Sequence, residues 1–202
     1  MSVGRTLFDG ASLGRTAIFG CGEGGGGGTA DLFDILTGKV TTTKLRGGSR
    51  KKCAATSVVL ARDSNGQPTA GKILIGGGYK SVAVDIWDLK TGTWSVSKMS
   101  ISHFYMAAAA AGPFSLFCGG LAPSGDTSIC DVYVRTGSLL PPPLLVALTK
   151  TYCFLRRQDA RGGGSWSVTH MIAPMREIAA TSIDYQGKQQ AVFCGGGHLQ
   201  VS

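Results

Sequence analysis

KILIGGGYKSVAVDIWDLKTGTWSVSKMSISHFYMAAAAA, the stretch from Lys72 to Ala111, carries the strongest structural signal in this 202-residue chain. An apolar run ends in Gly-Gly, and an alternating segment, Val84–Asp88, follows it. A Thr-Gly turn then leads to a segment with Trp94, and a run of small residues closes the unit. Alternation with a period of two and glycines at turns are typical of strands. The stretch therefore predicts four consecutive β-strands.

The same pattern recurs along the chain, so the fold is built from repeats. The other copies are Thr16–Leu45, Ser115–Gly137 and Gly164–Gly197. Asp31 lies 54 residues before Asp85, and Asp131 lies 46 residues after it, which gives a mean period of 50. Cys53 lies eight residues after Leu45, as Ala107 lies eight residues after Met99, so the repeat alignment pairs Cys53 with Ala107. We predict repeats at 16–71, at 72–114 and at 115–137 continued at 165–190, with a partial repeat at 191–202.

Gly-Gly, an aromatic residue and Thr91-Gly92-Thr93-Trp94, at a period near 50, resemble the kelch repeat over about 175 residues. The resemblance implies an all-β fold: residues 1–202 form a partial β-propeller of about three to four four-stranded kelch blades. Blades stack because one blade cannot bury both of its faces alone. Closed propellers contain about four to eight blades. We therefore expect a fragment of a longer protein, with assembly of two open arcs as the alternative.

The segment 138–164 interrupts the third copy. Removing these 27 residues joins CDVYVRTG to SWSVTHM, which then matches VDIWDLKTGTWSVSKM, and shortens the distance from Gly119 to Gly195 from 76 to 49 residues. It is either a long loop inserted at a β-turn or an untranslated stretch such as an unspliced intron. The usual shortness of loops favours the second interpretation. If the protein contains the segment, its apolar run Leu139–Leu148 is a candidate interaction site.

Composition narrows the class of protein and its location. Apolar residues make up 43% and charged residues 16%, which favours a globular chain. The six cysteines form no CxxC pair, the N-terminus lacks the apolar core of a signal peptide, and no run could span a bilayer. We therefore expect reduced thiols, a cytoplasmic location and no membrane contact.

The net charge of +8 raises the question of an acidic partner. The dense basic cluster consists of Lys44, Arg46, Arg50, Lys51 and Lys52, and a looser one of Arg156, Arg157 and Arg161. No aromatic residue interleaves with the first cluster, so a platform for stacking bases is not indicated. A solvated basic loop is favoured over a nucleic-acid site.

Other chemical motifs favour structural roles. Gly20–Gly25 matches G-x-G-x-x-G, but the sequence that follows predicts a strand where a dinucleotide site needs a helix. The pairs Asp31/Asp34 and Asp85/Asp88 recur at one repeat position, which favours capped turns over a hydrolytic pair. The histidines are expected on the surface or in loops, the equivalent Cys118 and Cys194 are expected to be buried thiols, and Cys153 lies in the insert. The three histidines are His103, His170 and His198.

These features predict no catalytic residue, cofactor or metal site. The kelch resemblance implies a non-catalytic module that binds or scaffolds a protein through loops on one face, without assigning partner-binding residues. The alternative is a fragment of a galactose oxidase-like or carbohydrate-active propeller enzyme whose catalytic residues lie outside this chain. Nucleic acid is not expected as a partner, and self-association of an open arc is a further alternative.

Overall fold

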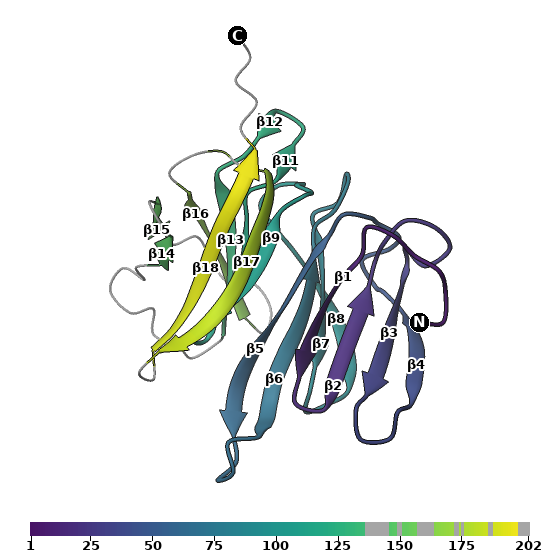
Figure 1. Ribbon diagram of the computed structural model, residues 1–202. Coiled ribbons are helices and arrows are strands. Elements are labelled where there is room, and N and C mark those ends of the chain that lie inside the picture. The colour runs from purple at the N-terminus through teal and green to yellow at the C-terminus, as the bar shows by residue number, and fades with distance from the viewer. Residues whose placement is uncertain are drawn as a thin grey trace. The chain divides into compact units, whose positions relative to one another are not determined.

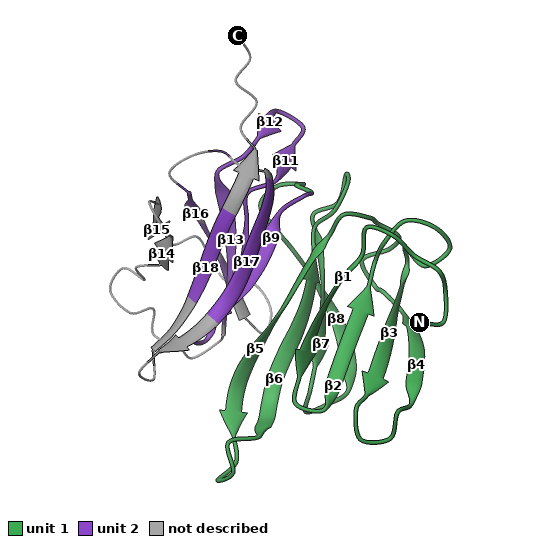
Figure 2. Ribbon diagram, in the orientation of Figure 1, with its two compact units in different colours: residues 1–104 green, residues 105–202 purple. Residues whose placement is uncertain are grey.

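The computed structural model describes residues 1–135, 146–148, 151–156, 164–171, 174, 176–185 and 188–197. In these residues strands alternate with turns and bends and no helix occurs, so the all-β prediction is confirmed. A helix able to cross a membrane is accordingly absent from the described residues. The chain divides into two compact units, residues 1–104 and 105–202 (Figure 2).

The first unit holds two four-stranded antiparallel sheets, each made of consecutive strands (Figure 1). The first sheet contains β1 (Asp9–Leu13), β2 (Thr16–Gly20), β3 (Thr29–Asp34) and β4 (Val40–Lys44). The second sheet contains β5 (Ala54–Arg62), β6 (Pro68–Gly76), β7 (Ala83–Asp88) and β8 (Thr93–Lys98). Neither sheet closes on itself.

The core of the first unit joins one face of each of these sheets. Ile18 and Ala30 from the first sheet share a buried cluster with Ile73, Ile75 and Trp87 from the second. Successive side chains of a strand point to opposite faces, so each strand contributes every second residue to this core. The residues that alternate in the sequence therefore form the apolar faces through which the first sheet packs against the second.

The second unit contains one large antiparallel sheet and two smaller ones. The largest has the order β14 (Val146–Leu148), β15 (Thr151–Arg156), β16 (Gly164–His170), β13 (Ile129–Arg135), β10 (Phe114–Cys118) and β9 (Ala107–Ala111). Two hairpins accompany it: β11 (Leu121–Ala122) with β12 (Gly125–Asp126), and β17 (Arg176–Tyr185) with β18 (Lys188–Gly197). Leu116 and Val132 of the large sheet share a buried core with Ile178 and Phe193 of the β17–β18 hairpin.

Strands β14 and β15 belong to the predicted insert 138–164, and the rest of that segment up to Gly164 lies outside the described residues. β13 and β16, on either side of it, pair directly, with Tyr133 opposite Trp166. The same register places Trp87 opposite Trp94 in the second sheet. The insert therefore interrupts a hairpin whose two strands pair as they do in an uninterrupted copy.

Equivalent positions recur from sheet to sheet in register and in backbone conformation. The pairs opposed across the second and third strands of each copy are Phe19–Asp31, Ile75–Asp85 and Phe117–Asp131. The residue two positions before β1, β5 and β9 has a positive φ of 52–61°; these residues are Leu7, Lys52 and Tyr105. Glu177, the second residue of β17, has a φ of 55°. These φ angles set Cys53 level with Met106, so the sequence alignment of Cys53 with Ala107 is wrong by one residue.

The recurring aspartates serve two different purposes. Asp34 and Asp88 cap the Thr-Gly turns, as predicted: the Asp88 Oδ1 accepts from the backbone N–H of Lys90 at 2.9 Å and of Thr91 at 3.1 Å. Asp34 makes the equivalent pair of bonds. Asp31 and Asp85 each pair with a buried arginine. Asp85 also caps a turn, because its Oδ1 accepts from the backbone N–H groups of Arg46 at 2.6 Å and Gly47 at 2.9 Å.

Two disulfides contradict the prediction of reduced thiols. Cys21 bonds to Cys53, which links the end of the first sheet's β2 to the start of β5, and Cys118 bonds to Cys130 across β10 and β13. Cys194 is free and exposed, so its expected burial is also wrong. Disulfides of this kind persist in oxidising compartments and are rare in the cytosol.

Candidate functional site: a pocket at the glycine-rich loop

Residues 21–28 form a glycine-rich loop between β2 and β3 in the first unit. At Gly22, where φ is 114°, a Cβ would lie 2.9 Å from the Thr6 backbone oxygen and 3.1 Å from the Phe8 Cβ. Only glycine fits there, because both the conformation and the space exclude a side chain. A strand follows the loop, as predicted, where a dinucleotide site of the G-x-G-x-x-G type needs a helix.

Backbone hydrogen bonds clamp this loop between two distant segments. The Glu23 N–H donates to the Thr6 oxygen at 2.7 Å, and the Gly22 N–H donates to the Arg50 oxygen at 2.9 Å. In return the Arg50 N–H donates to the Gly27 oxygen at 3.0 Å. The loop is therefore held in one position despite its glycine content.

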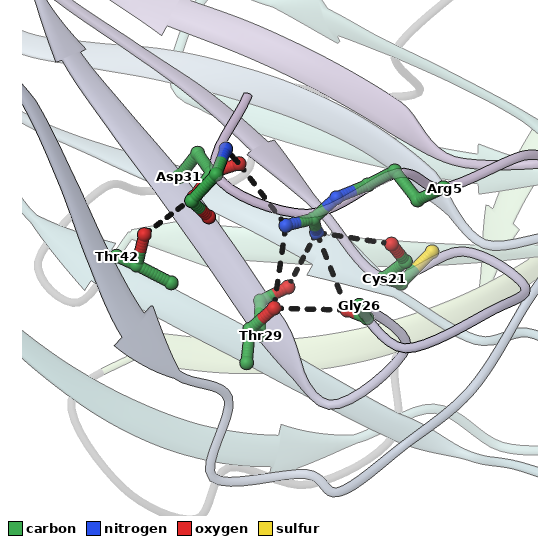
Figure 3. A network of polar contacts seen from close by, with 7 residues as sticks. Arg5, Cys21, Gly26, Thr29, Asp31 and Thr42 are labelled. Atoms are coloured by element: carbon green, nitrogen blue, oxygen red, sulfur yellow. Dashed lines mark hydrogen bonds and ion pairs between the residues drawn. The ribbon is translucent and has the colours of Figure 1, made fainter.

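A buried guanidinium supports the loop from within (Figure 3). The Arg5 Nη1 donates to the backbone oxygens of Cys21 at 3.2 Å, Gly26 at 3.3 Å and Thr29 at 2.8 Å. Its Nη2 pairs with the Asp31 Oδ2 at 3.1 Å, and the Arg5 side chain is fully buried. Arginine suits this position because its planar fork can serve several acceptors at once.

Lowering the pH should weaken this support. Burial alone would raise the pKa of Asp31, but hydrogen bonds from Ser2 and Thr42 and the charge of Arg5 outweigh it and hold the pKa below its usual range. The stabilisation is therefore present above the unfolded-state pKa of about 3.9 and is lost as the pH falls through the folded-state value. We expect the urea midpoint of the wild type to fall below about pH 4.

The variant Asp31→Asn separates this contribution from that of the other carboxylates. It should be less stable than the wild type at pH 7, because Arg5 loses its buried counter-charge, and its midpoint should fall less steeply with acid. Parallel slopes for both proteins would contradict the assigned role of Asp31.

An open pocket of about 280 Å³ lies beside the loop, and we call it the loop pocket. Its lining residues are Gly22, Glu23, Gly24, Ser49, Arg50, Lys51 and Tyr79. They come from three segments, which immediately follow β2, immediately precede β5 and immediately follow β6. The Tyr79 N–H donates to the Lys51 oxygen at 3.0 Å, which fixes the third segment against the second.

An aromatic pair flanked by lysines adjoins the loop pocket. Tyr79 is 45% exposed, and its ring meets that of Phe104 edge-on with 5.3 Å between the centroids. The Lys80 Nζ lies 5.3 Å from the Tyr79 centroid, and the Lys52 Nζ lies 5.3 Å from the Phe104 centroid. Such cation–π contacts order the side chains while leaving the ammonium groups positive.

The predicted basic cluster is divided among different environments. Arg50 is fully buried in an ion pair with Asp85, Lys51 pairs with Glu23, and Lys52 lies over Phe104. Lys44 and Arg46 stay exposed. The looser cluster Arg156, Arg157 and Arg161 falls outside the residues whose side chains are described. Three members of the dense cluster therefore have partners within the protein.

The histidines do not gather at this pocket. His103 lies in the loop between β8 and β9, as the prediction allowed, but its side chain is fully buried. His170 is exposed on β16, and its Nδ1 lies 3.3 Å from the Ser128 hydroxyl. His198 and the side chain of Cys153 lie outside the described part of the chain. Within the described residues, no three His, Cys, Asp or Glu side chains are placed to hold a metal ion.

Sequence reasoning missed Tyr79 and Glu23, although a signal was present. Both residues directly follow the Gly-Gly position of their repeat, where the third copy has Leu121. A position that varies in chemistry between copies of one framework is typical of a loop that carries function. No protein-family model matches this chain, and no curated protein matches it, so the site is interpreted from its own geometry.

Proposed function

We propose that this chain is a kelch-type β-propeller segment that binds a protein partner through the loops at one end of its sheets. The support is repetition at three levels: consecutive four-stranded antiparallel sheets, equal cross-strand registers and equal turn caps. Such a framework holds its loops in fixed positions, which is how repeat folds present binding surfaces. The proposed function is binding, which requires no catalytic group.

The loop pocket and the adjoining aromatic pair, Tyr79 and Phe104, form the contact surface for an acidic segment of that partner. The observation that carries this proposal is the exposed Tyr79 ring between the pocket and the Lys80 ammonium group. Tyrosine is enriched in protein interfaces because it combines a large apolar ring with a polar tip. The net charge of +8 favours a partner of opposite charge and speeds its approach.

The two disulfides favour an oxidising compartment for this binding over the cytoplasm. Both bonds are buried, and one of them anchors Cys21 at the start of the glycine-rich loop. The compartment therefore bears on the pocket directly, because reduction would release one end of the loop that lines it.

Fluorescence anisotropy with two labelled peptide pools, one rich in Asp and Glu and one rich in Lys, tests the proposal. We expect the acidic pool to bind and the basic pool not to bind. Tyr79→Ala should weaken binding about tenfold, as expected for a central interface aromatic, and Lys80→Glu about fivefold. Lys90→Glu is the matched control, because Lys90 is an exposed lysine in the turn at the other end of β7.

Equal binding by all three variants would overturn the assignment of the pocket. Retention of copper by the purified protein, together with oxidation of sugars or aldehydes, would favour the galactose oxidase-like alternative over a binding module. Equal binding of both pools would show that charge does not select the partner.

A further inference from the structure

The first sheet has a second face, turned away from the core of its unit, that carries apolar side chains. We call it the open face, and it consists of Phe8, Phe19, Phe33, Ile35 and Val40. Phe19 lies on β2 next to Ile18, which points into the core, and Phe33 lies directly opposite Val40. The exposed fractions are 37% for Phe8, 36% for Phe19, 66% for Ile35 and 45% for Val40. Large apolar groups gathered on one exposed face mark an interaction surface.

The repeat itself shows what this face is built to do. One copy later, the five equivalent positions are Cys53, Ile75, Trp87, Leu89 and Trp94, as the cross-strand registers establish. All five pack in the core between the first and second sheets, and Ile75 is fully buried there. The residue types are similar, since Phe33 occupies the position of Trp87 and Ile35 occupies the position of Leu89. The open face is therefore a sheet-packing face without its sheet.

The structure also shows the kind of surface that covers such a face. Against Ile75 and Trp87, the first sheet presents aliphatic and small residues, among them Ile18 and Ala30. The hairpin β17–β18 carries the equivalent surface, which we call the terminal face, formed by Ala179, Thr181, Val192 and Cys194. Val192 stands where Ile18 stands, because Thr181 opposes Val192 as Ala11 opposes Ile18. Ala179, Thr181 and Cys194 are exposed, and Val192 is half-buried.

We propose that the open face of one copy of this chain packs against the terminal face of a second copy, head to tail. The chain makes this type of contact twice within itself, between the first two sheets and between the large sheet and β17–β18. The residues named for the two faces are uncharged. The charged residues beside them on the same sides are Asp31, which opposes Phe19 and pairs with Arg5, the exposed Lys44 at the end of β4 and the exposed Glu177 near the start of β17. Such a heterologous interface gives a ring if the rotation closes and a filament if it does not.

This interface is separate from the loop pocket, so the two proposals can fail independently. The open face and the terminal face are sheet surfaces, whereas the pocket is built from loops. Lys80→Glu should leave self-association unchanged, and Phe19→Asp and Val192→Asp should leave peptide binding unchanged.

Sedimentation velocity of the purified chain, from about 1 to about 100 μM, tests the proposal. We expect the wild type to grow in mass with concentration, and Phe19→Asp and Val192→Asp each to stay monomeric. Val96→Asp is the matched control, because Val96 is an exposed valine on β8 outside both faces. Circular dichroism and urea unfolding verify that each variant is folded, and non-reducing electrophoresis identifies any disulfide through Cys194.

Mixing the two variants gives the decisive result. Phe19→Asp keeps an intact terminal face and Val192→Asp keeps an intact open face, so an equimolar mixture should form a dimer and grow no further. A mixture that stays monomeric while the wild type associates would overturn the head-to-tail arrangement. The proposed interface would be overturned if the wild type stayed monomeric at about 100 μM. It would also be overturned if Phe19→Asp associated as strongly as the wild type.

Discussion

Replacing Arg50 with alanine is expected to lower the free energy of unfolding by about 3–5 kcal/mol, because it leaves the Asp85 carboxylate buried without a counter-charge. The Arg50 Nη2 lies 2.6 Å from the Asp85 Oδ2, and both side chains are fully buried. The same guanidinium donates to the backbone oxygens of Ile75 at 2.9 Å and Gly48 at 3.1 Å. Alanine removes all of these bonds, so the loss should appear as a lower urea midpoint.

The matched control is Lys72→Ala. Lys72 pairs with Asp88 at 3.0 Å in the same sheet, but its side chain is 18% exposed and that of Asp88 is 29% exposed. Such partly solvated pairs contribute about 0–1 kcal/mol. A double variant, Arg50→Met with Asp85→Leu, should recover part of the stability lost by Arg50→Ala, since no unpaired charge remains. An Arg50→Ala protein as stable as Lys72→Ala would contradict the ion-pair argument.

The sequence predicts the strands well because their signal is local. Alternation in Val84–Asp88 and the Thr-Gly turns can be read within a few residues, and the structure has β7, a capped turn and β8 there. The ion pairs depend on distance in space. Arg50 and Asp85 are 35 residues apart, and the recurrence of Asp31 and Asp85 at one repeat position is equally compatible with a turn cap. Only the fold brings each carboxylate beneath the loop that carries its arginine.

The loop pocket could not be predicted for the same reason. Glu23, Lys51 and Tyr79 come from three loops that no local pattern connects, and clamping hydrogen bonds bring them together. The interpretation of the basic cluster as a solvated loop holds for Lys44 and Arg46 but is wrong for Arg50, because charge density says nothing about partners within the fold. Arg50 is a buried structural cation, whereas its neighbour Lys51 lines the pocket next to Glu23.

The cysteines show how an alignment of repeats can mislead. Cys118 and Cys194 occupy equivalent positions, which suggested one shared role as buried thiols. The role depends instead on the residue opposite: Cys118 faces Cys130, whereas Cys194 faces Ala179. Only the first pair can form a disulfide, and spacing in the sequence does not reveal which residues face each other.

Removing the Cys21–Cys53 disulfide is the second change with a large expected effect. Its cysteines are 32 residues apart, and in the chain-entropy treatment the cross-link stabilises the fold by about 3.7 kcal/mol. The bond between Cys118 and Cys130 spans 12 residues and should contribute about 2.8 kcal/mol. The variant Cys21→Ala/Cys53→Ala should therefore unfold at a lower urea concentration than Cys118→Ala/Cys130→Ala.

Dithiothreitol provides the control for both bonds. It should lower the urea midpoint of the wild type. In each double variant it should lower the midpoint only by the contribution of the one disulfide that remains. A variant with all four of these cysteines replaced should not respond. Because Cys21 starts the glycine-rich loop, reduction should also weaken binding of the acidic peptide pool more in the wild type than in Cys21→Ala/Cys53→Ala. A wild type that dithiothreitol does not destabilise would mean that its thiols are already reduced, and the case for an oxidising compartment would fall with the disulfides.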